Sequence, residues 1–363
     1  MIIGIDATAI SKKQKTGVEK TASQIIYNLL SFDKNNHYLL FCQTHLPKEY
    51  KKFKNIEEIR IPYKIFWHKV HLPLKLLKIK PDIFVSPSNE IPNFAPKKNI
   101  AFVYDLAFKY FPNAYSRSQL LILNSALKTI SRRAQMIVFP SNNSKKDFQK
   151  FYPKSKAKKY ILPLGVDKNI FKVTKEGNDF LNIKSKYFLY LGRLESRKNI
   201  TNLVRAYKLF CDKEKTKIKL VLAGAKGHGF SDIDLEIYKL LKNRCQIIMP
   251  GFIDDKYLPQ LYSQAEAFIF PSLYEGFGLP ILEAMSCGVP VIASNCSSLG
   301  EVAGDAVYYV DPKKPEEIAM AMKMITSDKK LRIKLIKDGF ERVKKFSWQK
   351  TAEELYKIIK KFN

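Results

Sequence analysis

Short apolar runs alternate with helical patterns along the first part of the chain. Runs rich in β-branched and aromatic residues occur at Met1–Ile5, Tyr38–Cys42, Ile83–Ser86, Ile100–Tyr104 and Met136–Phe139. Between them, residues 18–30 and 117–133 carry apolar side chains at helical spacing. This βαβ alternation predicts a parallel sheet covered by helices.

The second half of the chain repeats the alternation. Its strand-like runs are Tyr187–Leu191, Lys219–Ala223, Gln246–Met249, Ala267–Phe270 and Val289–Ala293, each followed by a helix-like segment. Between the two series, proline, glycine and charged residues interrupt the pattern from Leu162 to Lys186. We therefore expect an α/β protein with two doubly wound domains, residues 1–165 and 186–345, joined by a linker at 166–185.

The pattern of residues 346–363 at the C-terminus predicts one more helix. Ser347 is a suitable N-cap, and it precedes apolar residues at helical spacing, namely Trp348, Ala352, Leu355 and Ile359.

The composition argues against a membrane-spanning or secreted protein. The 363 residues contain no apolar run near the ~18 residues of a membrane span. Met1 leads directly into a strand-like run without the pattern of a signal peptide, and the five cysteines are odd in number and form no CxxC pair. A reducing cytoplasm is the expected compartment, and a zinc site is not expected.

The chain is strongly basic, with a net charge of +29. Residues 1–165 hold 29 basic and 10 acidic residues, so the first half carries +19 of the excess. Such a charge is typical of proteins that bind nucleic acid, anionic membranes or phosphorylated substrates. The alternative is lysines scattered over solvated surfaces, and the sequence leaves both open.

The densest candidate site runs from Phe270 to Met285. It passes from a strand end through a glycine-bearing loop into a helix with Pro280 at its expected first position, where a missing amide proton costs nothing. The amides of Gly278, Leu279 and Ile281 at the positive helix end would suit phosphate oxygens. Glu275 and Glu283 flank this turn, eight positions apart. The alternative is a plain glycine turn with solvated carboxylates.

Two further loops follow predicted strands. Arg193 and Lys198, after Leu191, could hold a diphosphate with a forked guanidinium and a point charge. Gly17, after the first strand, would let backbone approach a ligand at a helix start. A solvated basic loop and an ordinary glycine are the alternatives.

Together these segments resemble the GT-B, family-4 retaining glycosyltransferases (glycosyl transferases group 1), and bacterial mannosyltransferase-like members in particular. The hallmark Glu-x7-Glu element corresponds to Glu275 and Glu283. The Gly-Arg-x4-Lys-Asn loop at 192–199, the Pro-Gly-Phe-Ile segment at 250–253 and Leu-Gly-Val-Asp at 164–167 follow in family order. The resemblance implies two Rossmann-like domains with an interdomain cleft, and a last helix that crosses back to the N-terminal domain.

The resemblance also implies roles for individual residues. Arg193 and Lys198 would hold the donor diphosphate, the loop after Glu275 would face the donor sugar, and Glu283 would bind the ribose. The remaining expected donor contacts are Gly17, Gly251, Phe252, Ile253, Gly276, Phe277, Gly278 and Leu279. Catalytic residues would be Glu275, Asp105, Arg193 and Lys198, with no metal or other cofactor. Tyr104 stands where many relatives have the His of His-Asp-Leu-Ala-Phe.

The implied function is transfer of a hexose, with retention, from a nucleotide-diphosphate sugar to a glycan or lipid-linked acceptor in cell-surface polysaccharide synthesis. GDP-mannose is the favoured donor, and a UDP-sugar is the alternative. A basic nucleic-acid-binding protein is the alternative of another class, but no RRM or helix-turn-helix signature is present. We expect a cytoplasmic enzyme, with the charge favouring a peripheral position on the inner face of the cytoplasmic membrane.

Residues 66–80 mix large apolar groups with basic ones, as interfacial helices do. The alternative is that Leu72, Leu76 and Ile79 face the sheet and the lysines form a solvated face. His68 and His71 lack a third ligand nearby, so a metal site is not expected there.

Overall fold

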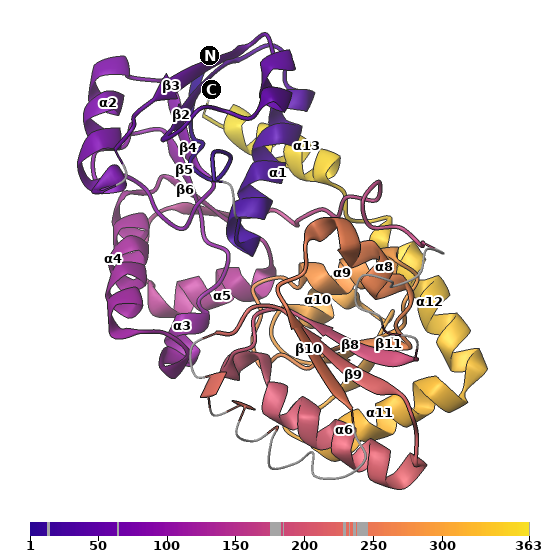
Figure 1. The fold of residues 1–363 in the computed structure, drawn as a ribbon. Coiled ribbons are helices and arrows are strands. Elements are labelled where there is room, and N and C mark those ends of the chain that lie inside the picture. Colours follow the sequence, from indigo (N-terminus) through magenta and orange to yellow (C-terminus); the bar gives the residue numbers. More distant parts are fainter. Residues whose placement is uncertain are drawn as a thin grey trace. The chain divides into compact units, whose positions relative to one another are not determined.

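Two parallel sheets organise the chain, and each belongs to a separate unit (Figure 1). The computed structural model describes residues 1–12, 15–63, 65–174, 183, 185–227, 230, 231, 233, 234, 237 and 246–362. The first unit comprises Met1–Leu106, Arg117–Gly165 and Ser347–Asn363, and the second comprises Ala107–Ser116 and Val166–Phe346.

The described part of the first unit contains a seven-stranded sheet in the order β3-β2-β1-β4-β5-β6-β7. Its strands are β1 (Ile2–Asp6), β2 (His37–Cys42), β3 (Ile56–Arg60), β4 (Ile83–Ser86), β5 (Asn99–Phe102), β6 (Met136–Phe139) and β7 (Lys158–Ile161). Its longer helices are α1 (Gly17–Phe32), α2 (Leu72–Ile79), α4 (Arg117–Arg133), α5 (Asn142–Phe151) and α13 (Trp348–Lys360). All strand pairs are parallel, so their carboxyl ends share one edge.

The described part of the second unit contains a six-stranded parallel sheet in the order β10-β9-β8-β11-β12-β13. Its strands are β8 (Tyr187–Leu191), β9 (Lys219–Ala223), β10 (Ile247–Gly251), β11 (Ala267–Phe270), β12 (Val291–Ser294) and β13 (Tyr308–Val310). Its helices are α3 (Ala107–Tyr110), α6 (Ile200–Glu214), α8 (Leu258–Ser263), α9 (Leu279–Ser286), α10 (Leu299–Ala303), α11 (Pro315–Ser327) and α12 (Lys329–Val343).

The structure confirms the predicted fold class, two α/β units with parallel sheets. The strands that the pattern missed all lie at sheet edges. β3 and β7 are the two edges of the first sheet, and β13 is an edge of the second. β3 and β7 carry charged, exposed residues, and β13 has only three residues. Edge strands are commonly short and charged, so they lack the apolar run that marks a central strand.

The two units differ in detail from the expected division of the chain. Ala107–Ser116, which includes α3, groups with the second unit although it lies within the first half of the sequence. The expected linker from residue 166 onward also packs on the second unit, because the Thr174 amide donates to Ser263 Oγ (3.1 Å) and Ser286 Oγ donates to the Phe171 carbonyl (2.6 Å).

Helix α13 belongs to the first unit and lies beside α1 (Figure 1). Ser347 caps it, accepting from the Lys350 amide at 3.2 Å. Thr351 Oγ1 donates to the Pro163 carbonyl at 2.8 Å, and the rings of Phe32 and Tyr356 meet edge to face at 5.5 Å. The last helix thus packs on the N-terminal sheet's own layer of helices.

Gly165 permits this packing. A Cβ atom at Gly165 would lie 2.1 Å from the Trp348 nitrogen and 2.3 Å from the Ser347 carbonyl carbon. Both of those atoms are backbone, so they cannot rotate away. The glycine is required because the chain leaving the first sheet crosses the start of α13 at van der Waals distance.

We expect Gly165→Ala to destabilise the protein by roughly 1–3 kcal/mol, the usual cost of overpacking a closed contact. Urea unfolding would measure this as a lower midpoint. Gly300→Ala is the matched control, because a Cβ at Gly300 meets no atom within 4 Å. Equal midpoints for Gly165→Ala and the control would contradict the packing argument.

Candidate functional site

The candidate site of the second unit lies at the carboxyl ends of its strands. β8 leads into the loop with Arg193 and Lys198, β10 ends at Gly251, and β11 leads into the loop that contains Glu275. Open α/β sheets bind their ligands at this edge, because loops from neighbouring strands converge there. The structure therefore brings together the basic loop and the acidic loop that were predicted separately.

A buried ion-pair cluster joins the two loops. Lys198 Nζ donates to Glu275 Oε1 at 2.5 Å, and Arg197 Nη1 lies 3.6 Å from Glu275 Oε2. Arg197 Nε is also 2.6 Å from Oε1 of Glu195. The Lys198 and Glu275 side chains are only 10% and 11% exposed. Two cations thus face two carboxylates, and the cluster is close to neutral.

The cluster keeps Glu275 ionised. Burial by itself raises the pKa of this carboxyl, but the charges of Lys198 and Arg197 outweigh burial and hold the pKa below its usual value. An ionised carboxylate in this position fixes the Lys198 ammonium against the strand ends. Lys198 also lies 5.6 Å from the centre of the Phe270 ring, where β11 ends.

Two serines hold the acidic loop in place. The Glu275 amide donates to Ser297 Oγ at 2.9 Å, and Ser298 Oγ contacts the carbonyls of Glu275 and Phe277 at 2.8 and 2.9 Å. Arg197 Nη1 donates to the Tyr274 carbonyl at 3.2 Å. The loop conformation is therefore set by side chains that follow β12 and β8.

The glycine turn leads into α9 as expected, with two corrections. Gly278 has φ of 111°, a left-handed conformation that favours glycine, and a Cβ there would lie 2.7 Å from Leu299 Cδ2. Pro280 is the second residue of α9 and not the first as expected, because the helix begins at Leu279. The Ile281 amide, which we expected to offer itself to phosphate, instead donates to the Gly278 carbonyl at 3.0 Å, because the chain tightens at the helix start.

Glu283 lies on α9 and is held from the neighbouring helix. Tyr262 Oη, on α8, donates to Glu283 Oε2 at 3.0 Å. Tyr262 is fully buried, whereas Glu283 is partly exposed. The buried tyrosine therefore orients a carboxylate whose residue still reaches solvent.

The remaining expected donor contacts lie on the loops after β8 and β10 and after β11. Arg193 is exposed, beyond Gly192. Gly251 has φ of 77°, Phe252 is 69% exposed and Ile253 is buried. In the acidic loop, Phe277 is buried and its ring meets Phe346 edge to face at 5.9 Å. The loop residues Gly276 and Leu279 flank Phe277 and Gly278.

Gly17 and Asp105 lie in the first unit. Gly17 is the first residue of α1, and a Cβ there would meet no atom within 4 Å. Asp105 is partly exposed and follows β5 by three residues, just before the segment 107–116 that packs with the second unit. In that segment, Tyr110 stacks on Tyr274, next to Glu275, at 5.3 Å.

Tyr104 is buried, and its hydroxyl is already engaged. Tyr104 Oη donates to the Pro87 carbonyl at 2.9 Å, and the Tyr104 amide donates to Asn89 Oδ1 at 3.0 Å. Burial raises the pKa of the Tyr104 hydroxyl. In this chain, position 104 therefore supplies a packing residue with a neutral side chain.

A second charged cluster lies in the first unit. His68 belongs to the π-helical turn η2 (Trp67–His71); its Nε2 is 2.7 Å from Oδ2 of Asp6, and its Nδ1 is 2.5 Å from Oε2 of Glu90. Burial alone lowers the pKa of His68, but the two carboxylates outweigh burial and raise the pKa to about 10. His68 is therefore protonated at neutral pH. Among the described residues, no group of three or more His, Cys, Asp and Glu is suited to hold a metal ion.

Sequence reasoning missed several of these residues. Glu195 and Arg197 stand beside predicted Arg193 and Lys198, but only the distances show which charges pair. Tyr262 and Ser298 come from segments far along the chain, and they carry no local signal. Asp6 was detectable as a carboxylate directly after the first strand.

Known proteins share both the fold and part of the sequence. Residues 174–342 match the family model described as Glycosyl transferases group 1. Over 176 residues, 48% of this chain and 46% of the relative, the chain is 39% identical to the O-antigen chain mannosyltransferase B of Escherichia coli. The chain spans less than half the length of the first curated relatives it matches.

Solved structures match over the whole chain. Sucrose-phosphate synthase from Thermosynechococcus elongatus superimposes with a TM-score of 0.77 at 20% identity, covering 100% of this chain and 99% of that one. Anabaena HepE in complex with UDP-glucose superimposes with a TM-score of 0.72 at 17% identity, covering 99% of each chain. The fold is that of the GT-B glycosyltransferases. The buried ion-pair cluster lies within residues 174–342, the part of the chain that matches the glycosyl transferases group 1 model.

We expect Lys198→Met to destabilise the protein by about 3–5 kcal/mol, because it leaves the buried Glu275 carboxylate without its main partner. The double variant Lys198→Met/Glu275→Gln should recover much of that loss. Lys208→Met is the matched control: Lys208 pairs with Asp212 at 2.6 Å on the surface of α6, and such pairs contribute about 0–1 kcal/mol. Urea unfolding measures all of these variants. A double variant no more stable than Lys198→Met would show that the pair is not the source of the loss.

We expect the stabilisation from His68 to depend on pH. Its pKa rises from 6.5 to about 10 in the folded protein, so its contribution is full below pH 6.5 and disappears as the pH rises through about 10. The difference in urea midpoint between wild type and His68→Asn should therefore shrink from pH 6 to pH 10. His45→Asn is the control, since His45 is 74% exposed beside Glu58. A constant difference over this pH range would be incompatible with the ion-paired imidazolium.

Proposed function

We propose that this protein is a retaining glycosyltransferase that moves a hexose, with mannose from GDP-mannose as the favoured donor, to a glycan or lipid-linked acceptor in cell-surface polysaccharide synthesis. The observation that carries the proposal is the Lys198–Glu275 cluster at the strand ends, inside the glycosyl transferases group 1 domain. The similarity to an O-antigen chain mannosyltransferase supports both the sugar and the kind of product.

The donor diphosphate would meet positive charge in the second unit. In the transition state the leaving diphosphate gains negative charge, and preorganised cations stabilise this charge most effectively. Lys198 is held in place by Glu275, and exposed Arg193 on the same loop can reach a ligand. The positive end of α9 after Gly278 adds to the same field. These groups act without a metal in this scheme.

Glu283 would bind the nucleoside. Its carboxylate is oriented by Tyr262, and a carboxylate can accept both hydrogen bonds of a ribose diol. Gly251, Phe252 and Ile253 would border the base. The backbone at Gly251 is left-handed, and exposed Phe252 offers a flat apolar surface for stacking.

Retention requires that the acceptor oxygen end up on the same face of the anomeric carbon that the diphosphate leaves. We assign the sugar to the loop after Glu275, and we keep Asp105 of the first unit as a proposed catalytic residue. Same-face attack, with the leaving phosphate accepting the acceptor proton, is consistent with the buried, ion-paired state of Glu275, which disfavours its use as a free nucleophile.

A UDP-sugar donor is the second candidate. It is favoured by the likeness of the fold to a structure solved in complex with UDP-glucose. A peripheral position on the inner face of the cytoplasmic membrane completes the proposal, because acceptors linked to lipid are presented there. None of the described helices is long and apolar enough to cross a membrane.

A thermal-shift panel of GDP, UDP, ADP and their sugars tests the donor. GDP-mannose should raise the melting temperature, and Glu283→Gln should weaken that shift while keeping the hydrogen bond from Tyr262.

Arg193→Ala should cut mannosyl transfer by about 10²-fold, the usual effect of removing one preorganised donor. Arg132→Ala, an exposed arginine of α4, is the matched control.

The outcomes separate the two donors. Stabilisation and turnover with UDP-sugars alone would overturn GDP-mannose and support the second candidate. Wild-type transfer by Arg193→Ala, with circular dichroism unchanged, would overturn the diphosphate assignment itself. Product with inverted anomeric configuration, read by the proton coupling at the new linkage, would overturn retention.

A further inference from the structure

Residues 65–80 of the first unit form a segment with two apolar faces. One face is buried, which agrees with the expectation that Leu72, Leu76 and Ile79 face the sheet. Trp67, Leu72 and Leu76 belong to the core that packs on the first sheet, and Ile79 packs against that core. That burial accounts for one side of η2 and α2. It leaves the large apolar side chains on the other side unexplained.

The second apolar face is open to solvent. Phe66, Val70, Leu74 and Leu77 are 61%, 41%, 62% and 52% exposed, and their spacing of four, four and three residues places them on one side of a helix. Ile65, in the turn before η2, is 72% exposed. A helix with apolar residues on two opposite sides normally has both of those sides covered. A contiguous exposed apolar patch normally marks a binding surface.

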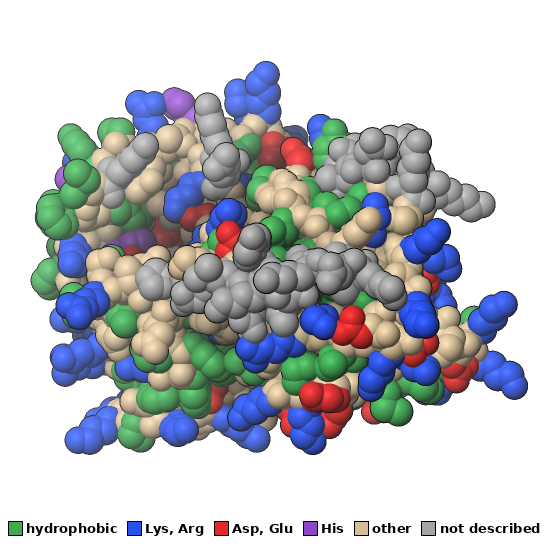
Figure 2. Space-filling model, turned by 60° about the horizontal axis from the view of Figure 1, so that its bottom comes forward, with side chains coloured by type: hydrophobic (Ala, Val, Ile, Leu, Met, Phe, Trp, Pro, Cys, Tyr) green, Lys and Arg blue, Asp and Glu red, His purple; other side chains and the backbone are tan. Residues whose placement is uncertain are grey.

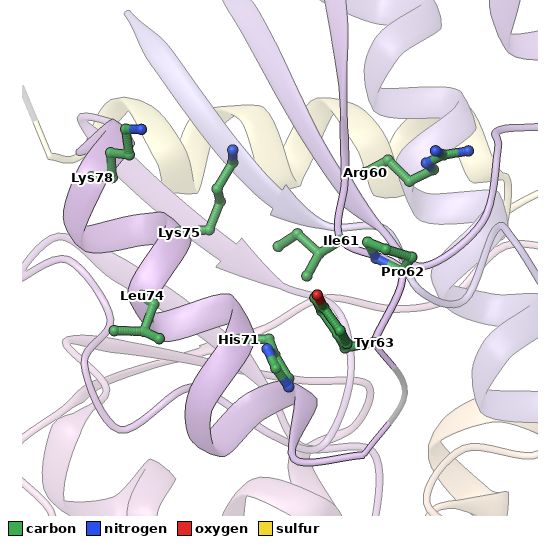
Figure 3. Close-up of a pocket in the computed structure, with 8 residues that line it drawn as sticks. All are labelled: Arg60, Ile61, Pro62, Tyr63, His71, Leu74, Lys75 and Lys78. Carbon is green, nitrogen blue, oxygen red and sulfur yellow. The ribbon is translucent and has the colours of Figure 1, made fainter.

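Cations lie along one edge of this face, where Leu74 lines a pocket together with Lys75 and Lys78. Between residues 59 and 81 the sequence holds six Lys or Arg and no Asp or Glu. Arg60, Lys75 and Lys78 line an open pocket of about 360 Å³ beside α2, together with Tyr63 (Figure 3). The Tyr63 and His71 rings stack at 4.3 Å across this pocket, and the amino ends of Lys75 and Lys78 extend from the helix (Figure 3).

This combination separates the segment from the rest of the basic surface. Lys and Arg side chains are spread over the whole face that Figure 2 shows, as solvated lysines would be. At α2, however, Lys75 and Lys78 line one pocket with exposed Leu74. A nucleic acid would match the cations but not the aliphatic face. An anionic bilayer matches both, because its headgroups attract Lys and Arg while its interface buries apolar side chains.

We propose that residues 65–80 form the surface by which this protein docks on an anionic lipid bilayer. Phe66, Val70, Leu74 and Leu77 enter the interfacial layer, and Arg60, Lys75 and Lys78 contact lipid phosphates. The inference rests on the peripheral position proposed above and adds the surface that achieves it. It does not depend on the identity of the donor.

Vesicle flotation of the full chain tests the surface. At low salt the wild type should float with vesicles of phosphatidylcholine and roughly one third phosphatidylglycerol, and not with phosphatidylcholine alone. Leu74→Ser/Leu77→Ser should weaken partitioning by at least about 10-fold, because two exposed leucines no longer enter the interface. Lys75→Gln/Lys78→Gln should weaken it to a similar extent, at ~1 kcal/mol for each cation.

Matched controls use exposed residues of the second unit. Met320→Ser/Ile333→Ser replaces two side chains that are 60% and 67% exposed on α11 and α12, and Lys329→Gln/Lys330→Gln removes two exposed lysines of α12. Both should partition like wild type. Equal losses in the controls, or wild-type flotation of Leu74→Ser/Leu77→Ser, would overturn the proposal.

Two further measurements exclude other occupants of this face. If sedimentation velocity showed a dimer of wild type that Leu74→Ser/Leu77→Ser dissolves without vesicles, the face would bind a second copy and the proposal would fail. The GDP-mannose thermal shift should be unchanged in Leu74→Ser/Leu77→Ser. Vesicle binding without any nucleotide-dependent shift would leave the docking surface standing and reject the donor assignment instead.

Discussion

The pairing of Lys198 with Glu275 is the interaction on which the candidate site depends. It joins the loop after β8 to the loop after β11, two neighbouring strands of the second sheet, at a 2.5 Å contact that is almost fully buried. A buried charge is costly without a partner, so each residue requires the other in the folded state. The pair therefore holds a cation at the strand ends, as the proposed stabilisation of a leaving diphosphate requires.

Glycines set how closely the backbone segments approach one another. Gly165 lets the chain cross the start of α13 in the first unit, and Gly278 turns the acidic loop into α9 in the second. A Cβ at Gly224 would lie 2.0 Å from the Gly192 carbonyl oxygen, so the ends of β8 and β9 also meet backbone to backbone. In the second unit, the loops that carry the charged groups lie close together because glycines, which have no side chain, allow their backbones to approach one another.

The first unit carries different chemistry from the second. Its partly buried His68 is fixed between Asp6 and Glu90, and the same turn continues into a helix whose outer face is apolar and has lysines at one edge. One segment therefore contributes to the core, to a charged cluster and to an exposed surface. The two interpretations of residues 66–80, a packed helix and an interfacial helix, apply to opposite faces of the same element.

The sequence by itself determined the parallel α/β class, most central strands and the loops that hold the candidate residues, because apolar periodicity is local and strand ends are marked by glycine and charge. The sequence pattern did not predict the edge strands β3, β7 and β13, because β3 and β7 are largely exposed and β13 has only three residues. Only the tertiary structure decided which charges pair, that Arg197 and Glu195 join the cluster, and that the Ile281 amide is occupied. Those outcomes depend on distances between segments remote in sequence, which no local pattern encodes.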